Sequence, residues 1–289
     1  MNIALSKEER QDRRLGDGNL GAAEKAIREE GYVILDGVVD HDHLDMLWYQ
    51  MIQDIETILA RPEPPHQFLY GNVQQDPPPY APFVFEDVIE NPWVNQITRH
   101  ILGEGVFNNF YSGNTNIPGS KLQPVHVDGG DLWKGLTNPQ PPYRLIVNIA
   151  LKDVTEENGS IELWPGTHLL MSNAVGEDIK INPDLVRERK AVHPPVRGNT
   201  EKGSILIRDS RAWHRGTPND SDQPRFMIAL THGAAFMTRH RHTVFSREVA
   251  SVFPSDAVTE YVLSDEPIPY LERHSTYDFP TQGYIEPLL

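Results

Sequence analysis

The feature that most restricts the fold is a series of short segments between Val106 and Leu230. Each is apolar or alternating and is bounded by Gly, Pro, Asn or Asp: Val106–Tyr111, Leu122–Val127, Tyr143–Leu151, Ile161–Leu163, Ser204–Ile207 and Phe226–Leu230. Segments of this length and spacing are typical of antiparallel sandwiches and jelly rolls. The 24 prolines and 21 glycines among 289 residues also favour a loop-rich fold over a helical bundle. We therefore predict a mainly β core.

The N-terminal third has helical periodicity instead. A short helix is predicted from Ala22 to Glu30, closed by Gly31 and followed by a strand at Tyr32–Leu35. Asp40 can cap a longer amphipathic helix, whose apolar residues recur at helical spacing as far as Leu59.

Three further segments lie outside the strand-rich part of the chain. Asn91-Pro92 begins a helix that Gly103 closes. Residues 1–20 are polar and without apolar periodicity, which predicts a solvated arm or a short surface helix. A last helix is predicted near Asp256–Leu263.

The chain contains no internal repeat and no linker-like stretch, so we expect one domain over residues 1–289. Residues 1–104 form its mainly helical N-terminal layer, residues 105–235 its β core and residues 236–289 a C-terminal extension. Residues 171–202 are polar and contain prolines without a clear period, and we expect them to form a long loop, or lid, over one mouth of the core.

Charge and cysteine content exclude several classes of function. The 26 basic and 41 acidic side chains give a net charge of −15, which argues against a nucleic-acid or anionic-membrane partner. The absence of cysteine excludes disulfides, thiolate metal sites and cysteine nucleophiles. No apolar run is long enough for a membrane helix, and the lack of a signal start and of cysteine predicts a cytoplasmic protein.

One histidine–carboxylate triplet lies in the strand-rich part of the chain. His126 and Asp128 are two residues apart, so on a strand both side chains point to the same face. His214, from a distant segment, could complete a set of two imidazoles and one carboxylate. This set suits non-haem iron(II), and it also suits zinc or manganese. A second triplet, His43-Leu44-Asp45, lies in a predicted helix, where residues two apart diverge by about 200°.

An arginine follows the last of these histidines at a distance that a hairpin would span. The turn-rich residues 217–224 separate His214 from Arg225, which begins an apolar strand. A hairpin would bring Arg225 back beside His214, where its guanidinium could bind the distal carboxylate of a dicarboxylate bidentately. The alternative is a structural arginine in a surface ion pair.

Together these residues resemble the phytanoyl-CoA dioxygenase-like family of iron(II)/2-oxoglutarate oxygenases. The resemblance also includes Asn158-Gly159 and Pro165-Gly166-Thr167-His168, and it runs from about Gly31 through Leu230. The segment Lys121–Asp128 is similar to the Gln-Pro-x-His-x-Asp form of members that serve natural-product pathways.

The resemblance implies a fold and a set of site residues. The fold is mainly β with a helical N-terminal layer, a double-stranded β-helix of the jelly-roll or cupin-like kind. Its metal ligands would be His126, Asp128 and His214, all three catalytic, and Arg225 would hold 2-oxoglutarate. Gln123 and Asn148 lie where members contact this co-substrate, although Asn148 occupies a position that is often tryptophan. His168 is expected to be structural.

The implied activity is that of a dioxygenase with Fe(II) as cofactor and 2-oxoglutarate and O2 as co-substrates. It would oxidise a C–H bond of a small, mostly apolar metabolite, with succinate and CO2 as co-products. Hydroxylation is the default outcome, and desaturation, epoxidation or ring rearrangement are the alternatives. Four aromatic residues are candidate substrate contacts: Trp133, Trp213, Tyr70 and Phe85.

Three alternatives remain open at this point. One is an acyl-CoA hydroxylase of the same family. Another is a jelly-roll protein that binds zinc or manganese without oxygen chemistry, and the third is a non-catalytic binding module. Arg225 separates the metal-only alternative from the oxygenase, because a metal-only protein has no need of a dicarboxylate clamp.

Overall fold

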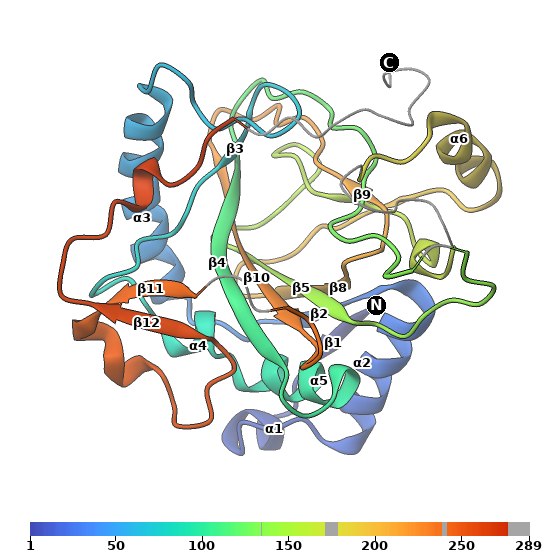
Figure 1. The fold of residues 1–289 in the computed structure, drawn as a ribbon, viewed down its shortest axis with the longest axis horizontal. Coiled ribbons are helices and arrows are strands. Elements are labelled where there is room, and N and C mark those ends of the chain that lie inside the picture. Colours follow the sequence, from blue (N-terminus) through green and yellow to red (C-terminus); the bar gives the residue numbers. More distant parts are fainter. Residues whose placement is uncertain (134, 171–178, 239–241, 277–289) are drawn as a thin grey trace.

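A seven-stranded sheet forms the centre of the fold, in the order β1-β2-β8-β5-β10-β4-β3 (Figure 1). The computed structural model describes residues 1–133, 135–170, 179–238 and 242–276. The sheet's neighbouring strands are antiparallel except β1 and β2, which are parallel. Its strands are β1 (Asn2–Ala4), β2 (Tyr32–Asp36), β3 (Asn72–Gln74), β4 (Phe107–Asn116), β5 (Arg144–Ala150), β8 (Ile205–Asp209) and β10 (Arg225–Gly233).

A second, smaller sheet has the strand order β7-β6-β9. Its strands are β6 (Glu162–Leu163), β7 (Val196–Arg197) and β9 (His214–Arg215). Residues from this sheet and from the main sheet line one cavity. The predicted β core is therefore confirmed as a major antiparallel sheet, and the fold as a whole is mixed α/β.

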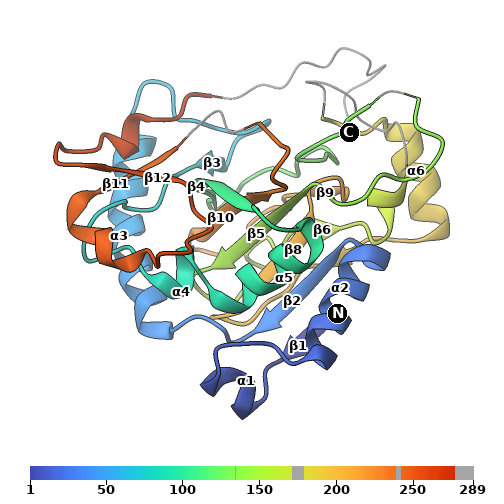
Figure 2. The same ribbon diagram turned by 60° about the horizontal axis from the view of Figure 1, so that its bottom comes forward.

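Helices cover the face of the main sheet that points away from this cavity (Figure 2). Alternation along β5 shows the two faces. Leu145, Val147 and Ile149 are buried in the helix-covered hydrophobic core, whereas Arg144, Ile146 and Asn148 line the cavity. The α-helices are α1 (Lys7–Gln11), α2 (Asp17–Glu30), α3 (His41–Leu59), α4 (Glu86–Ile89), α5 (Pro92–Leu102) and α6 (Pro183–Val192).

The helix ends predicted from capping residues are confirmed. Helix α2 ends at Gly31, whose φ of 86° is the left-handed conformation that glycine adopts without strain. The Asp40 carboxylate caps α3 by accepting a hydrogen bond from the Asp42 amide. Asn91 caps α5, and Gly103 follows its last residue. Helix α2 begins at Asp17, five residues earlier than predicted.

The prediction for residues 1–20, a solvated arm or a short surface helix, is confirmed in part, because most of these residues are exposed and Lys7–Gln11 forms a surface helix. Strand β1 pairs with β2, and Ile3, Leu5 and Leu15 are buried in the core beneath the helices. Only α1 is a surface helix, because none of its residues is buried. Isolated apolar residues in a polar stretch give no periodicity, and their burial depends on a strand far along the chain.

Three other predictions need correction. The region 171–202, predicted to be a loop, contains helix α6, which begins after its Asn182 cap. The helix buries only Val186, so its sequence shows almost no apolar periodicity. The segment 171–178 of the predicted lid lies outside the described residues. In place of the helix near 256–263, β12 (Tyr261–Ser264) pairs in parallel with β11 (Thr243–Ser246). The segment 122–127 forms no strand, only a bridge at His126.

The remaining helical turns are 3-10 helices, η1 (Thr167–Leu169), η2 (Arg247–Val252) and η3 (Tyr270–Glu272). Among the described residues, no helix combines the length and the apolar character that crossing a membrane would need.

Candidate metal centre

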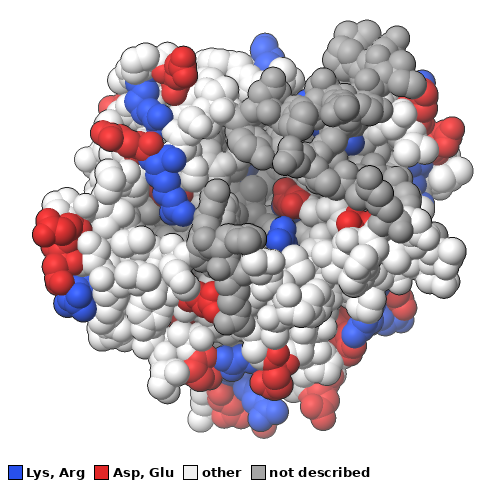
Figure 3. Space-filling model, viewed as in Figure 1, with Lys and Arg blue, Asp and Glu red and all other residues white. Residues whose placement is uncertain are grey.

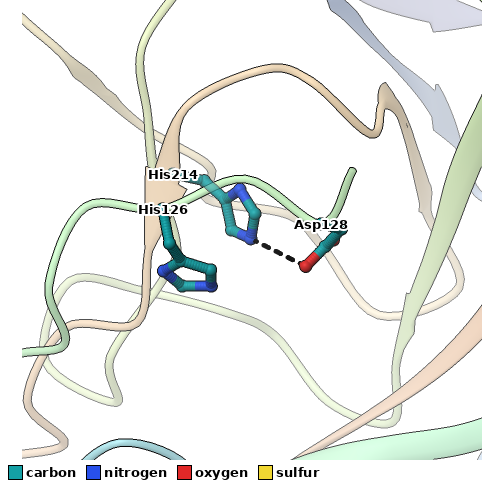
Figure 4. A group of neighbouring side chains, drawn as sticks. All are labelled: His126, Asp128 and His214. Atoms are coloured by element: carbon teal, nitrogen blue, oxygen red, sulfur yellow. Dashed lines mark ion pairs between the residues drawn. The ribbon is translucent and has the colours of Figure 1, made fainter. Parts of the chain in front are cut away.

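His126, Asp128 and His214 come together at one point of the cavity wall (Figure 4). One donor atom from each residue lies within 4.8 Å of the other two. The His214 Nε2 atom is 3.6 Å from Asp128 Oδ1, and the two imidazole centroids are 4.3 Å apart. The predicted set of two imidazoles and one carboxylate is therefore assembled.

Backbone pairing between two distant segments produces this arrangement. The amide of His126 donates to the carbonyl of His214 at 2.9 Å, and the His214 amide donates back at 3.0 Å. Two residues further on, the amides of Asp128 and Gly129 both donate to the Ser210 carbonyl. These four hydrogen bonds fix the segment 126–129 against the segment 210–214, so the ligands depend on this pairing and not on one long strand.

The two imidazoles are oriented as metal binding needs. Nδ1 of His126 lies 2.8 Å from the Pro124 carbonyl oxygen, and Nδ1 of His214 lies 3.0 Å from that of Ala212. Because a carbonyl only accepts, each Nδ1 is placed to donate there, and Nε2 is the ring nitrogen left to face the other ligands. Burial, followed by the neighbouring His214, lowers the pKa of His126 to about 3, so that ring is neutral at pH 7.

Asp128 provides the negative charge of the set. Burial opposes its ionisation, but Arg208 and the two histidines outweigh burial and hold the pKa of the carboxyl well below its usual value. Two imidazole nitrogens and one carboxylate are the donors that a divalent iron site with open positions uses. The residues present therefore fit such an ion.

Arg208 on β8 is a part of the site that the sequence did not reveal. Its side chain is buried, and its Nη2 donates to Asp128 Oδ2, the oxygen that is not next to His214. Its Nε donates to Asn148 Oδ1 at 3.2 Å. Arg208 therefore fixes the orientation of the Asp128 carboxylate, and Asn148 fixes Arg208. An arginine at the end of the apolar run Ile205–Ile207 was the only available signal.

Arg225 begins β10, as predicted, and its guanidinium is only partly satisfied. It is 6% exposed and lines the cavity. Its Nη2 donates to the Gly159 carbonyl at 3.0 Å, whereas Nε and Nη1 have no hydrogen-bond partner within the described residues. Burial lowers the pKa of Arg225 to about 10, which leaves it charged at pH 7. A buried cation with two unpaired donor nitrogens is costly unless an anion binds there.

The turn that holds Arg225 requires its glycine. Gly159 has a φ of 81°, and a Cβ atom there would lie 2.2 Å from the side-chain nitrogen Nδ2 of Asn116. The Asn158-Gly159 motif therefore brings a backbone carbonyl to Arg225 in a space that no side chain could share. Gln123 is also in the cavity wall, and its Oε1 accepts from the Gly216 amide at 2.7 Å.

The cavity that joins these groups has a volume of about 630 Å³, within the range of small-molecule sites. Figure 3 shows the hollow near the centre of this face, with charged side chains at its edge. Most of its wall is polar. The apolar contributions are Phe110, Ile146, Ile161, Met227 and Ala229.

A segment after η3 closes one side of this cavity and was not anticipated. Arg273, His274 and Ser275 line the wall. The buried carboxylate of Asp76 holds the segment, 2.6 Å from His274 Nε2 and 3.2 Å from Arg273 Nη1. Arg61 adds hydrogen bonds to the carbonyls of Leu271 and His274. The predicted C-terminal extension therefore contributes to the site.

The four aromatic residues predicted as substrate contacts do not line the cavity in the described part of the chain. Trp213 is 1% exposed and packs beside Trp164, and Phe85 stacks on His43 with ring centroids 4.0 Å apart. These two rings are packed elsewhere, so their prediction is corrected. Trp133 and Tyr70 are exposed, and their role stays a prediction.

Other side chains take the positions near the metal ligands. The Phe68 ring lies 4.7 Å from that of His126, and Phe110 is part of the cavity wall. His168 is buried and its Nε2 lies 3.0 Å from the Arg28 carbonyl oxygen of α2, as expected for a structural residue.

Comparison with known proteins adds a family match. The model of the family described as "Phytanoyl-CoA dioxygenase (PhyH)" matches residues 27–227. "Dioxygenase andF" of Emericella variicolor is 27% identical over 173 residues, which cover 56% of this chain and 55% of that protein. "Dioxygenase af480" of Aspergillus fumigatus is 25% identical over 232 residues, 76% of this chain and 68% of that protein. The chain thus spans about half the length of andF.

One similar solved structure is that of the epimerase SnoN in complex with Fe3+, alpha ketoglutarate and nogalamycin RO. The TM-score is 0.56 at 17% sequence identity, and the alignment covers 76% of this chain and 85% of SnoN. At this identity the likeness concerns the fold.

Proposed function

The chain belongs to the phytanoyl-CoA dioxygenase family, and from this premise we propose that it is an iron(II)/2-oxoglutarate-dependent dioxygenase acting on a small molecule. One observation carries the proposal. The cavity that contains the donors of His126, Asp128 and His214 also contains Arg225, a buried cation with two donor nitrogens that have no partner among the described residues. A metal-only protein has no use for that second feature.

His126, Asp128 and His214 would hold the iron, with Nε2 of each histidine as donor. When bound, iron supplies the oxidation of a substrate C–H bond, with O2 consumed and 2-oxoglutarate converted to succinate and CO2. The part of Arg208 is to keep the Asp128 carboxylate ionised and oriented, since it bonds the oxygen of Asp128 that is not next to His214.

Arg225 would hold the distal carboxylate of 2-oxoglutarate through Nε and Nη1. The pairing would be charge-assisted and would involve a buried guanidinium, for which such bonds are strong. Gln123 and Asn148 border the same cavity and support the orientation of this co-substrate. The two sheets around the cavity support the double-stranded β-helix that the family implies.

The substrate class we propose is a specialised metabolite. The Gln123-Pro124-Val125-His126-Val127-Asp128 motif supports this class, and so does the fold likeness to SnoN, which has nogalamycin RO in its complex. Hydroxylation is the simplest outcome at the substrate carbon.

The test is an anaerobic titration of the purified protein with iron(II) and then with 2-oxoglutarate. We expect one iron per chain and, on addition of 2-oxoglutarate, the visible charge-transfer absorption of a chelated iron(II). His214→Ala should lose both signals, and His193→Ala, at the end of the surface helix α6, should keep both. Iron binding without the absorption band in wild type would support the metal-only alternative and contradict the proposal.

A further inference from the structure

The positive charges of the cavity wall are not all balanced. Four arginines line the cavity, at positions 144, 208, 225 and 273. Arg208 pairs with Asp128, and Arg273 pairs with Asp76. In the proposed function Arg225 receives the distal carboxylate of 2-oxoglutarate. This assignment leaves Arg144 as the cavity arginine that has no carboxylate partner among the described residues.

Arg144 is the first residue of β5, so the strand fixes the position of its backbone. Its guanidinium makes no hydrogen bond or ion pair with the described residues, and its Cζ lies 5.8 Å from the centroid of the Tyr143 ring. The side chain is half-buried and faces the cavity. A guanidinium in this position has its donors free for a ligand.

The sheet register places Arg144 and Arg225 at opposite ends of the cavity face. Along β5, Asn148 lies opposite Ala229 of β10, and Arg144 lies opposite Gly233. Arg225 is at the other end of β10, two residues before Met227, whose partner is Ala150. The two arginines are therefore about eight residues apart along the ladder, which is roughly 26 Å between Cα atoms.

The metal ligands lie close to the Arg144 end of this face. The Ser210 amide donates to the Arg144 carbonyl at 3.1 Å, and the Ser210 carbonyl accepts from Asp128. Ile146, the next inward residue of β5, lies opposite Arg208. A co-substrate that reaches from the metal toward Arg225 therefore leaves the Arg144 side of the metal for the substrate.

We propose that Arg144 binds a carboxylate of the substrate and so fixes which of its C–H bonds faces the metal. This inference rests on the proposed function and refines its substrate class. The charge-assisted bidentate pairing gives orientation as well as affinity, which a mostly apolar contact surface would not give. It replaces the expectation of a mostly apolar substrate with that of a metabolite that carries an acid group at one end.

The test measures binding and does not depend on turnover. Wild-type protein is loaded anaerobically with iron(II) and saturating 2-oxoglutarate, so that Arg225 is occupied, and is then titrated with 3-phenylpropionate or its methyl ester by calorimetry. The variants are Arg144→Met and Arg144→Lys. Arg247→Met serves as the control, because Arg247 is an exposed residue paired with Asp265 and does not line the cavity.

We expect wild type to bind the acid at least about tenfold more tightly than the ester, as loss of one charge-assisted pair implies. Arg144→Met should bind the acid as weakly as wild type binds the ester. Arg144→Lys should recover part of the affinity, and Arg247→Met should match wild type. Equal affinity of wild type and Arg144→Met for the acid, or no preference for acid over ester, would overturn the inference.

The same samples separate this inference from the proposed function. The charge-transfer absorption reports iron and 2-oxoglutarate before any acid is added, and Arg144→Met should leave it unchanged. If the absorption forms normally but the acid is not distinguished from the ester, only the role of Arg144 fails. If the absorption never forms in wild type, the proposed function fails, and the assignment of Arg144 fails with it.

Discussion

Replacing Arg225 with methionine should weaken 2-oxoglutarate binding strongly and iron binding little. Methionine keeps much of the length of the side chain and removes its charge. The structure leaves Nε and Nη1 of Arg225 available for the ligand. Each charge-assisted hydrogen bond contributes about 1.5–3 kcal/mol, so two of them amount to roughly 3 kcal/mol or more. The affinity for 2-oxoglutarate should therefore fall at least about a hundredfold.

The variant should remain folded, so the loss can be measured. Arg225→Met gives up one hydrogen bond to the Gly159 carbonyl, a cost of about 1 kcal/mol. It also removes a buried cation whose pKa burial lowers to about 10, and this change favours the folded state. The two effects oppose each other, so the free energy of unfolding should change by less than about 2 kcal/mol.

The assay is an anaerobic 2-oxoglutarate titration at saturating iron(II), with iron affinity measured separately. The matched control is Arg197→Met, because Arg197 donates to the Ser160 and Thr217 side chains and the Ser160 carbonyl and does not line the cavity. Arg197→Met should lower stability but keep the wild-type affinity for 2-oxoglutarate. An affinity within about threefold of wild type in Arg225→Met would refute the clamp and make Arg225 a structural residue.

Three further changes have defined outcomes. His214→Ala should fold, as judged by circular dichroism, but retain no iron after desalting, and stoichiometric iron would contradict its role as ligand. Asp76→Asn removes the charge partner of Arg273 and His274, so amide exchange in residues 270–276 should accelerate while iron affinity stays unchanged; unaltered exchange would mean that other contacts hold the segment. Burial, with a smaller effect of Arg99, lowers the pKa of His232 to about 3. In the unfolded chain this histidine has a pKa of about 6.5, so lowering the pH from 7 to 5 protonates the unfolded state but not the folded one and destabilises the wild type. His232→Asn lacks this effect, so its free energy of unfolding should fall by about 2 kcal/mol less than that of wild type over the same pH range. Equal pH dependence of the two proteins in urea titrations would refute this.

The features that the sequence predicted best are those that depend on residues close together in the chain. Asp40, Asn91 and Gly31 act through atoms within one helical turn, so the ends of α2, α3 and α5 could be predicted from these residues. The grouping of His126, Asp128 and His214 was also predicted, from the spacing of His126 and Asp128 together with the family resemblance, although the local strand was wrong.

What the sequence did not reveal depends on contacts between distant segments. Strand β9 has only two residues and exists through its pairing with β6 and with His126. Arg208 looked like the end of an apolar strand, because its partners Asp128 and Asn148 come from other segments. The cavity role of Arg273 depends on Asp76, far earlier in the chain. A pattern within one segment carries no information on such pairings.

We propose that one iron and one 2-oxoglutarate share the cavity between His126, Asp128, His214 and Arg225. The most direct measurement is a crystal structure of the protein prepared without oxygen in iron(II) and 2-oxoglutarate, with anomalous data collected at the iron edge. We predict one strong anomalous peak bounded by His126 Nε2, His214 Nε2 and an Asp128 carboxylate oxygen, and density for 2-oxoglutarate from that peak to the Arg225 guanidinium. An iron peak elsewhere, or 2-oxoglutarate bound away from Arg225, would contradict the account.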